Sequence, residues 1–379
     1  MGFLLLGSVL AASFPVLVQQ PNPIRVQSAT ELGNITSDNF PNVYRDAGWE
    51  SQIGSRWLKF YADTLTCENG PAGPCHGFAS NTLVAANDDN PVVNHDLGNP
   101  GPGNNPVGLC APVTEGTRPQ FSAIISTGPS TGVAWYHSVG PATADDVNGA
   151  VVNSGVATIT WYGDDSPPHC EMSAPMWNST EPVWGDKGVW VSSSVLEQTS
   201  LVMLHPTNGR HQGPGMDGYA YILGGQSSLA PGHEDDYIWL SRVPYGNFWD
   251  VDAYQYWNGS AWDSKRLSYP NYNGWAPATV ITGTAGTLLY SDYYKTFVYV
   301  QSDWSTKTAS SIQGPWSEPV TLFTSTDGII YAPAPQTHYD TTGKTLVIDY
   351  SIFTPIYMKS VQIVSATIPP LYVVGASSD

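Results

Sequence analysis

The sequence predicts an all-β fold, a five-bladed β-propeller built as a single domain. No long stretch carries helical periodicity; instead, short runs rich in β-branched and aromatic residues recur between Gly, Pro, Asn and Asp. Several of these runs form adjacent pairs followed by a Trp-containing turn, which is the pattern that radial sheets around one axis produce. About five such units of roughly 70 residues fit the length of the chain.

The composition agrees with this fold and narrows the class of partner. The chain has 379 residues, 41% of them hydrophobic, which is enough for a sizeable core. Its 37 Gly, 31 Pro and many aromatic residues are typical of short strands joined by tight turns. The net charge is −18 and Lys and Arg form no cluster, which disfavours nucleic acid and anionic membranes, because both bind clustered positive charge.

Eight runs are expected to be strands because they combine β-forming residues with turn residues at their ends. They are Trp57–Tyr61, Gly132–His137, Val156–Tyr162, Gly188–Ser192, Gly218–Leu223, Tyr237–Ser241, Lys295–Val300 and Lys344–Tyr350. Two pairs are expected to be neighbours within one sheet: Tyr219–Leu223 with Tyr237–Ser241, and Thr287–Tyr290 with Phe297–Val300. Asn87–Pro106 is dense in Asn, Asp, Gly and Pro, so we expect a long surface loop there.

The beginning of the chain indicates secretion. Met1–Ser13 is a short apolar run that ends in small residues, so residues 1–20 are interpreted as a secretory signal peptide and 21–379 as the propeller domain. A buried N-terminal strand is the alternative. Three Asn-x-Ser/Thr sequons, at Asn34, Asn178 and Asn258, predict glycosylation and support an extracellular protein.

The four cysteines are expected to form disulfides in an oxidising compartment, where three pairings are open. Cys67 with Cys75 would close a short loop and leave Cys110 for Cys170. Zinc is disfavoured because no Cys-x-x-Cys or paired-His spacing accompanies these cysteines. No cofactor is required by any motif, although calcium could bind the acidic cluster 233–236, for which a solvated turn is the alternative.

Two early aspartates are the candidate catalytic residues. Asp46 and Asp63 bracket the first expected strand pair, and loops at one end of a propeller converge on its axis. Glycosidic cleavage needs two carboxyls: one donates a proton to the leaving oxygen, and the other attacks the anomeric carbon or activates water. Arg45 is expected to hold one of them ionised. The alternative is that Asp-x-Gly and Asp-Thr are ordinary turn and capping elements.

Further candidates come from residue type and position. Glu115 or Glu171 is a candidate third acid, with a surface carboxylate as the alternative in each case. Trp49, Arg242 and His338 are candidate substrate-binding residues, although most tryptophans must pack in the blades. A blade-internal ion pair is the alternative for Arg242, and a structural histidine is the alternative for His338.

A series of short motifs carries a family resemblance. In order they are Trp57–Thr66, Tyr237–Pro244, Ala253–Gly259 with Trp262, Gly314–Trp316, Tyr331–Pro333, Gly343–Leu346 and Tyr350–Ser351. In this order they resemble the domain-of-unknown-function 4185 group, associated with glycoside hydrolase family 183. The resemblance implies a five-bladed propeller that cleaves arabinofuranose-containing polysaccharide as an endo-D-arabinanase, with Asp46 and Asp63 as its acidic pair. The sequence departs from the family at Ala62, where the family has Gly.

The leading function is therefore hydrolysis of a glycosidic bond in a polysaccharide or oligosaccharide. Two other functions stay open. One is a non-catalytic carbohydrate-binding propeller, which would bind glycans without cleaving them. The other is a polysaccharide lyase, which the 14 basic residues disfavour because a lyase usually neutralises a uronate carboxylate.

Overall fold

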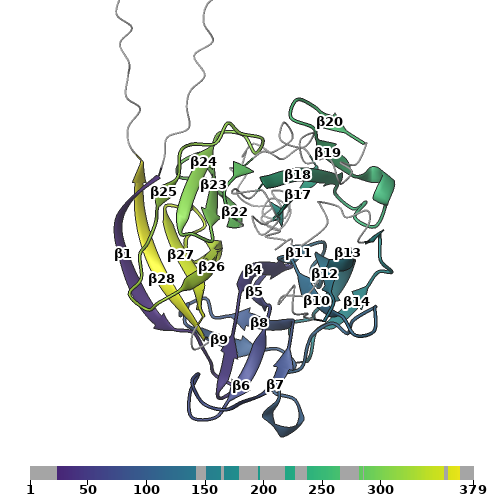
Figure 1. Ribbon diagram of the computed structural model, residues 1–379, viewed down its shortest axis with the longest axis vertical. Helices are drawn as coiled ribbons and strands as arrows, with labels where there is room; N and C mark the ends of the chain where they lie inside the picture. Colours follow the sequence, from purple (N-terminus) through teal and green to yellow (C-terminus); the bar gives the residue numbers. More distant parts are fainter. Residues whose placement is uncertain are drawn as a thin grey trace, which may run out of the picture.

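The computed structural model describes residues 24–141, 151–163, 166–178, 195–196, 218–226, 237–264, 281–284, 286–353 and 357–367. These residues form six β-sheets, five of which have four to six strands. The five larger sheets stand around a common centre as the blades of a propeller (Figure 1). The expected five-bladed, all-β architecture is confirmed.

The first blade has the strand order β2-β9-β8-β5-β4, with β4 nearest the centre (Figure 1). Its strands are β2 (Thr36–Ser37), β4 (Gly48–Ile53), β5 (Arg56–Tyr61), β8 (Thr82–Ala86) and β9 (Val93–Asp96). The small three-stranded sheet beside it contains β3 (Val43–Arg45), β6 (Thr64–Cys67) and β7 (Cys75–Ala79). Both sheets are formed by the first 100 residues of the chain, which also hold the two candidate aspartates.

The next three blades follow in chain order around the ring (Figure 1). The second contains β10 (Arg118–Phe121), β11 (Ile125–Ser126), β12 (Thr131–Val139), β13 (Val151–Thr160), β14 (His169–Met172) and β15 (Trp177–Asn178). The third contains β16 (Val195–Leu196), β17 (Tyr219–Gln226), β18 (Tyr237–Pro244), β19 (Gln255–Trp257), β20 (Trp262–Asp263) and β21 (Ile281–Thr282). The fourth contains β22 (Gly286–Ser291), β23 (Thr296–Gln301), β24 (Ser305–Ala309) and β25 (Val320–Thr321).

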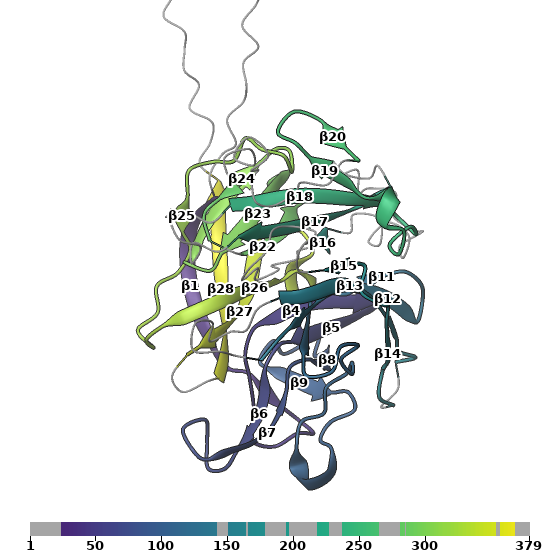
Figure 2. The same ribbon diagram turned by 45° about the vertical axis from the view of Figure 1, so that its right-hand side comes forward.

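The fifth blade joins the two ends of the chain. Its strands are β26 (Ile330–Gln336), β27 (Thr345–Ile352), β28 (Tyr357–Thr367) and, on the outside, β1 (Ile24–Asn34). β1 pairs antiparallel with β28 from Ile24↔Thr367 to Asn34↔Lys359, and the two strands lie side by side in Figure 2. The first described strand thereby covers an edge that the last strand would otherwise expose.

Most of the strand predictions are confirmed. Every expected strand run that the structure describes contains a β-strand, and both predicted pairs, now β17 with β18 and β22 with β23, are antiparallel neighbours. The run at 188–192 lies outside the described residues. The loop expected over Asn87–Pro106 is wrong in part, because it contains β9 and the 3-10 helix η1 (Pro102–Asn104).

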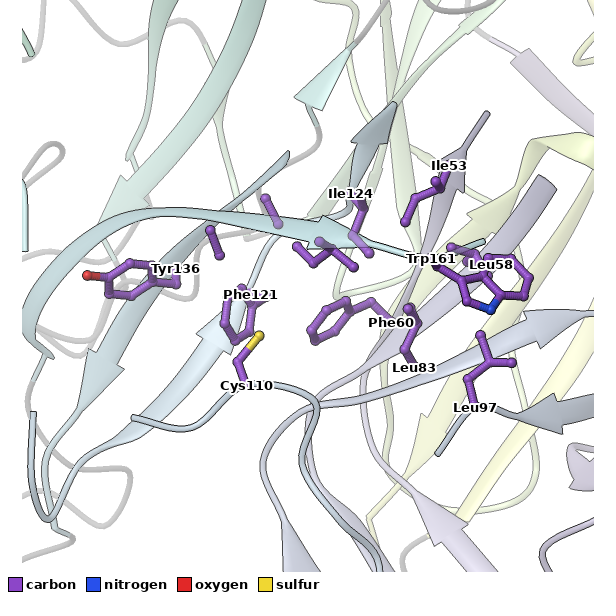
Figure 3. Packing of buried hydrophobic residues seen from close by; sticks show 13 residues of the cluster. Ile53, Leu58, Phe60, Leu83, Leu97, Cys110, Phe121, Ile124, Tyr136 and Trp161 are labelled. Atoms are coloured by element: carbon purple, nitrogen blue, oxygen red, sulfur yellow. The ribbon is translucent and has the colours of Figure 1, made fainter. Parts of the chain in front are cut away.

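Apolar cores fill the spaces between blades. Figure 3 shows the core between the first and second blades, where Ile53 and Phe60 meet Phe121 and Ile124. All four side chains are buried. These cores fix the angle between neighbouring blades and hence the place where their loops meet.

Both disulfides match the pairing that closes a short loop. Cys67–Cys75 joins β6 to β7, and Cys110–Cys170 connects the segment before β10 to β14 across 60 residues of sequence. Disulfides of this kind persist in oxidising compartments.

The seam between the first and fifth blades combines a small apolar cluster, formed by Tyr61, Val84 and Met358, with a buried ion pair. Lys59 of β5 donates a hydrogen bond to Asp349 of β27 over 2.9 Å, and both side chains are only 1% exposed. Burial raises the pKa of Asp349, and the Lys59 charge acts against that rise. A buried carboxylate needs such a partner, because an uncompensated buried charge is strongly destabilising.

The ion pair of the seam can be tested by removing one or both charges. Lys59→Met should lower the free energy of unfolding by about 3–5 kcal/mol, because Asp349 then stays buried without its cation. The double variant Lys59→Met/Asp349→Leu should lose less, since no charge is left inside. Urea denaturation measures both losses.

The control is Lys295→Met, which removes a lysine whose side chain is 69% exposed and should cost less than about 1 kcal/mol. An unchanged stability in the single Lys59 variant, or an equal loss in the double variant, would contradict the assignment.

Candidate active site

Asp46 and Asp63 are direct neighbours across two chain segments. Asp46 lies between β3 and β4, and Asp63 lies between β5 and β6. The pairs Arg45↔Thr64 and Gly48↔Tyr61 flank them, which places Asp46 opposite Asp63. The Asp46 backbone N–H donates to the Asp63 carbonyl over 2.8 Å. The two acids, 17 positions apart in sequence, therefore start from adjoining backbone.

The backbone beside Asp46 is distorted, and this distortion distinguishes it from an ordinary ladder. Ala47 has a φ of +44°, in the left-handed region that non-glycine residues seldom adopt. Its N–H donates to the Ser351 hydroxyl over 2.8 Å, which offsets the strain. Gly48 is required next, because a Cβ there would lie 2.5 Å from the Tyr61 ring. In the sequence Arg-Asp-Ala-Gly, the positive φ of Ala47 and the missing side chain of Gly48 thus produce the backbone conformation beside Asp46.

The fifth blade supplies two of the three hydrogen-bond donors to Asp46. The Asp46 carboxylate accepts hydrogen bonds from the Tyr331 and Ser351 hydroxyls of that blade and from the neighbouring Ala47 backbone N–H. Tyr331 and Ser351 face each other across β26 and β27, so one strand pair presents both hydroxyls. Each of these donors favours the ionised form of Asp46.

The two carboxyls differ in their electrostatic surroundings. Burial raises the pKa of Asp46, and its three hydrogen bonds oppose that rise. Burial, followed by the charge of Asp46, raises the pKa of Asp63 to about 6, while the Arg118 guanidinium acts to lower it. One oxygen of each aspartate is buried and has no hydrogen-bond partner among the described residues. A proton therefore resides more readily on Asp63 than on a solvated aspartate.

The acids lie at one end of the propeller axis. Asp46 precedes β4, Arg118 opens β10 and Tyr331 is the second residue of β26. These three strands are the innermost strands of the first, second and fifth blades (Figure 1). Residues from three blades thus meet around the aspartates at the end where the innermost strands begin.

Arg45 does not serve the acids in the way that we expected. Its guanidinium is buried, forms a short ion pair with Asp96 of β9 and lies 5.0 Å from the centre of the Tyr61 ring. The expectation failed because Asp96 comes from the segment that we interpreted as a loop. Arg45 thus holds β3 against the first blade.

Neither candidate third acid joins the pair. Glu115 is exposed in the turn before β10, and Glu171 is exposed on β14 near the outer edge of the second blade. Solvated side chains in such places are ordinary surface carboxylates. The described residues contribute Asp46 and Asp63 alone to the buried acids of this site.

The other candidate binding residues have structural contacts. His338, in the 3-10 helix η4 (Thr337–Asp340), is buried in the seam, where Nδ1 lies 2.6 Å from Glu50 and its ring stacks on Trp57 at 5.4 Å. The imidazole is thus held by contacts within the protein, as the structural alternative expects. Arg242 packs inside the third blade, with its guanidinium 4.1 Å from the ring centres of both Tyr219 and Trp262.

Trp49 is half-buried on β4 beside Ser51. By strand alternation it shares the face of Ser51, whose hydroxyl accepts from the Ile124 backbone N–H of the second blade. Trp49 therefore faces the second blade. The hydroxyl groups that donate to Asp46 come instead from the fifth blade.

The sequence reasoning missed Tyr331, Ser351 and Arg118 as site residues. Tyr331 and Ser351 lie within the short motifs Tyr331–Pro333 and Tyr350–Ser351 that carry the family resemblance, and this was the available signal. Arg118 had no such signal, because it begins a short strand that contains no motif. These three residues surround the pair with two hydroxyls and one cation.

Several predictions fall outside what the structure describes. The signal segment 1–20 and the acidic cluster 233–236 lie outside the described residues, as does Thr180 of the Asn178 sequon. Asn34 is exposed and Asn258 is half-buried, and glycosylation of all three sequons stays a prediction. Among the residues with described positions, no group of three or more His, Cys, Asp or Glu could hold a metal ion. That part of the chain also has no helix long and apolar enough to cross a membrane.

Comparisons with known proteins return matches in structure only. Neither a family model nor a curated protein matches the sequence. A structure described as a glycoside hydrolase is 10% identical with a TM-score of 0.47, covering 90% of this chain and 92% of that one. A thermostable family-43 glycoside hydrolase is 10% identical with a TM-score of 0.44, covering 88% and 96%. A putative exo-beta-1,3-galactanase from Bifidobacterium bifidum s17 is 14% identical with a TM-score of 0.42, covering 91% and 98%.

The raised pKa of Asp63 predicts how the stability of the protein depends on pH. A carboxyl whose pKa is raised on folding stabilises the fold below its ordinary pKa, and that contribution is lost as pH rises through about 6. Asp63→Asn removes the charge, so its melting temperature should exceed that of the wild type at about pH 8, with the gap closing near pH 4. Thermal melts across this range measure the gap.

Asp89→Asn is the matched control, because Asp89 is exposed in a turn of the first blade. Replacing this exposed side chain should leave the melting temperature close to that of the wild type. A gap for Asp63→Asn that does not change with pH would show that Asp63 does not titrate abnormally.

Proposed function

We propose that this protein is a secreted glycoside hydrolase that cleaves a polysaccharide with Asp46 and Asp63. The observation that carries the proposal is the pair itself: two opposed aspartates at one end of the propeller axis, both with raised pKa values. A pair of carboxyls in unlike surroundings is what acid-assisted glycosidic cleavage needs. The two disulfides fit an extracellular location.

The surroundings assign a role to each aspartate. Asp63 retains its proton to about pH 6, so it is the general acid that protonates the leaving glycosidic oxygen. Asp46 receives three hydrogen bonds that favour its charged form, so it is the carboxylate that attacks the anomeric carbon or activates water. Arg118 stabilises the negative charge that appears on Asp63 when its proton leaves.

The separation of the two carboxyl groups decides the stereochemical outcome. Retaining glycosidases hold their carboxyls about 5–5.5 Å apart, whereas inverting enzymes leave about 6.5–9.5 Å for a water molecule. The anomeric configuration of the first product, followed by NMR, therefore tells whether Asp46 attacks the anomeric carbon or activates water.

The favoured substrate is an arabinofuranose-containing glycan such as D-arabinan. This preference rests on the motif resemblance described above, and the position that departs from it lies at the site. Ala62, where the family has Gly, is buried, and its N–H donates to the carbonyls of Asp46 and Ala47. The position at which the chain departs from the family is thus hydrogen-bonded to the backbone of Asp46 and directly precedes Asp63.

The proposal is tested with Asp46→Asn and Asp63→Asn in folded protein. Each variant should lose at least about 100-fold in kcat on a cleaved glycan, because each removes a group that acts in the transition state. The assay follows new reducing ends on arabinans and on a panel of other polysaccharides, with Asp89→Asn as the control.

Other outcomes would assign other functions. Full activity in both Asn variants would remove the roles of the pair. Binding without new reducing ends would identify a carbohydrate-binding propeller, and products that absorb in the ultraviolet would identify a lyase.

The pH profile tests the assigned roles separately. In wild-type protein kcat/KM should fall on the alkaline side with a pKa of about 6, because Asp63 must be protonated. Tyr331→Phe removes one donor from Asp46, so it should move the acid-side limb toward higher pH and leave the alkaline limb in place. A shift of the alkaline limb alone would reverse the two roles.

A further inference from the structure

The face of the fifth blade that holds Asp46 continues into two exposed apolar side chains. Ile329 is 70% exposed and Phe353 is 57% exposed, although both adjoin a buried strand pair. The Phe353 backbone N–H donates to the Ile329 carbonyl over 3.1 Å, so the two residues extend the β26–β27 ladder by one pair. We call these two side chains the apolar ledge.

Strand alternation places the apolar ledge on the same face as the site. Tyr331 pairs with Ser351, and Ile329 and Phe353 stand two positions from them, which returns each side chain to that face. The intervening pair, Ile330 and Ile352, points the other way and packs in the core shared with the fourth blade. The apolar ledge and the two residues that donate to Asp46, Tyr331 and Ser351, therefore lie next to each other on one face of the fifth blade.

Tyr331 connects the ledge to the acid pair. Its hydroxyl donates to Asp46, and its ring lies 6.2 Å from the Phe353 ring at an interplanar angle of 69°. An aromatic pair in this edge-to-face geometry fixes the Phe353 ring in place. Scattered single apolar residues on a surface need no explanation, but this pair lies next to the proposed reacting carboxyls.

We propose that the apolar ledge is a sugar-binding subsite, which takes the glycosyl unit adjoining the one whose bond is cleaved. The C–H face of a sugar ring is apolar and packs on an aromatic ring, while its hydroxyls stay in water. Phe353 supplies the stacking ring and Ile329 widens the apolar surface. This inference rests on the proposed function for the position of the cleaved bond, and it adds a preference for chains over single sugars.

The experiment measures binding separately from cleavage. Phe353→Ala should weaken glycan binding about 3- to 10-fold, as the loss of one aromatic contact does. Binding is measured by calorimetry on the glycan panel in an Asp63→Asn background, which prevents turnover. Phe353→Tyr should restore binding, and Ile329→Ala should show a smaller loss. Melting curves confirm that each variant is folded.

In the cleaving enzyme, Phe353→Ala should raise KM for a long glycan and leave the smallest cleaved oligosaccharide nearly unaffected. The control is Tyr293→Ala, which removes an exposed aromatic of the fourth blade and should change neither constant. Unchanged binding in Phe353→Ala would overturn the subsite, as would a loss in Phe353→Tyr equal to that in Phe353→Ala.

The two proposals can fail separately. If wild-type protein binds a glycan through Phe353 without cleaving it, the hydrolase fails and the subsite stands. If the wild-type protein cleaves a glycan and Phe353→Ala changes neither binding nor KM, the subsite fails and the hydrolase stands. If it neither binds nor cleaves any glycan on the panel, both are overturned.

Discussion

The seam between the first and fifth blades is the constraint on which the site depends. Asp46 lies near the start of the described chain, yet the hydroxyl that fixes its neighbour Ala47 belongs to Ser351, 304 positions later. These residues meet across the seam where Lys59 pairs with Asp349, and β1 completes the fifth blade by pairing with β28. Closing the ring therefore also brings the hydroxyl donors to Asp46.

The same seam makes the two aspartates unequal. Burial raises the pKa of both carboxyls, but Asp46 receives hydroxyl donors from the fifth blade that oppose the rise, whereas the negative charge of Asp46 raises the pKa of Asp63 further. The two side chains thus differ in how readily each holds a proton. Environment alone produces such a division, and it is the usual way in which paired carboxyls take different roles.

Local pattern predicted the strands and the acid pair, but not the partners of buried polar residues. Runs of β-branched and aromatic residues between turn residues identified β5 and β12, and the two aspartates stood out because they bracket one strand pair. β9 was not predicted because its buried residues are Asn94 and Asp96, which are polar and give no pattern of apolar residues. Arg45 and His338 were misplaced for a related reason: their partners come from elements distant in sequence, and register between strands decides such contacts.

The closure of the fifth blade also has a meaning for biosynthesis. β26 carries Tyr331 and β27 carries Ser351, which is translated 304 positions after Ala47. A non-local strand pairing of this length is slow to form. A nascent chain that ends before β26 therefore holds Asp46 and Asp63 without the Tyr331 and Ser351 hydroxyls.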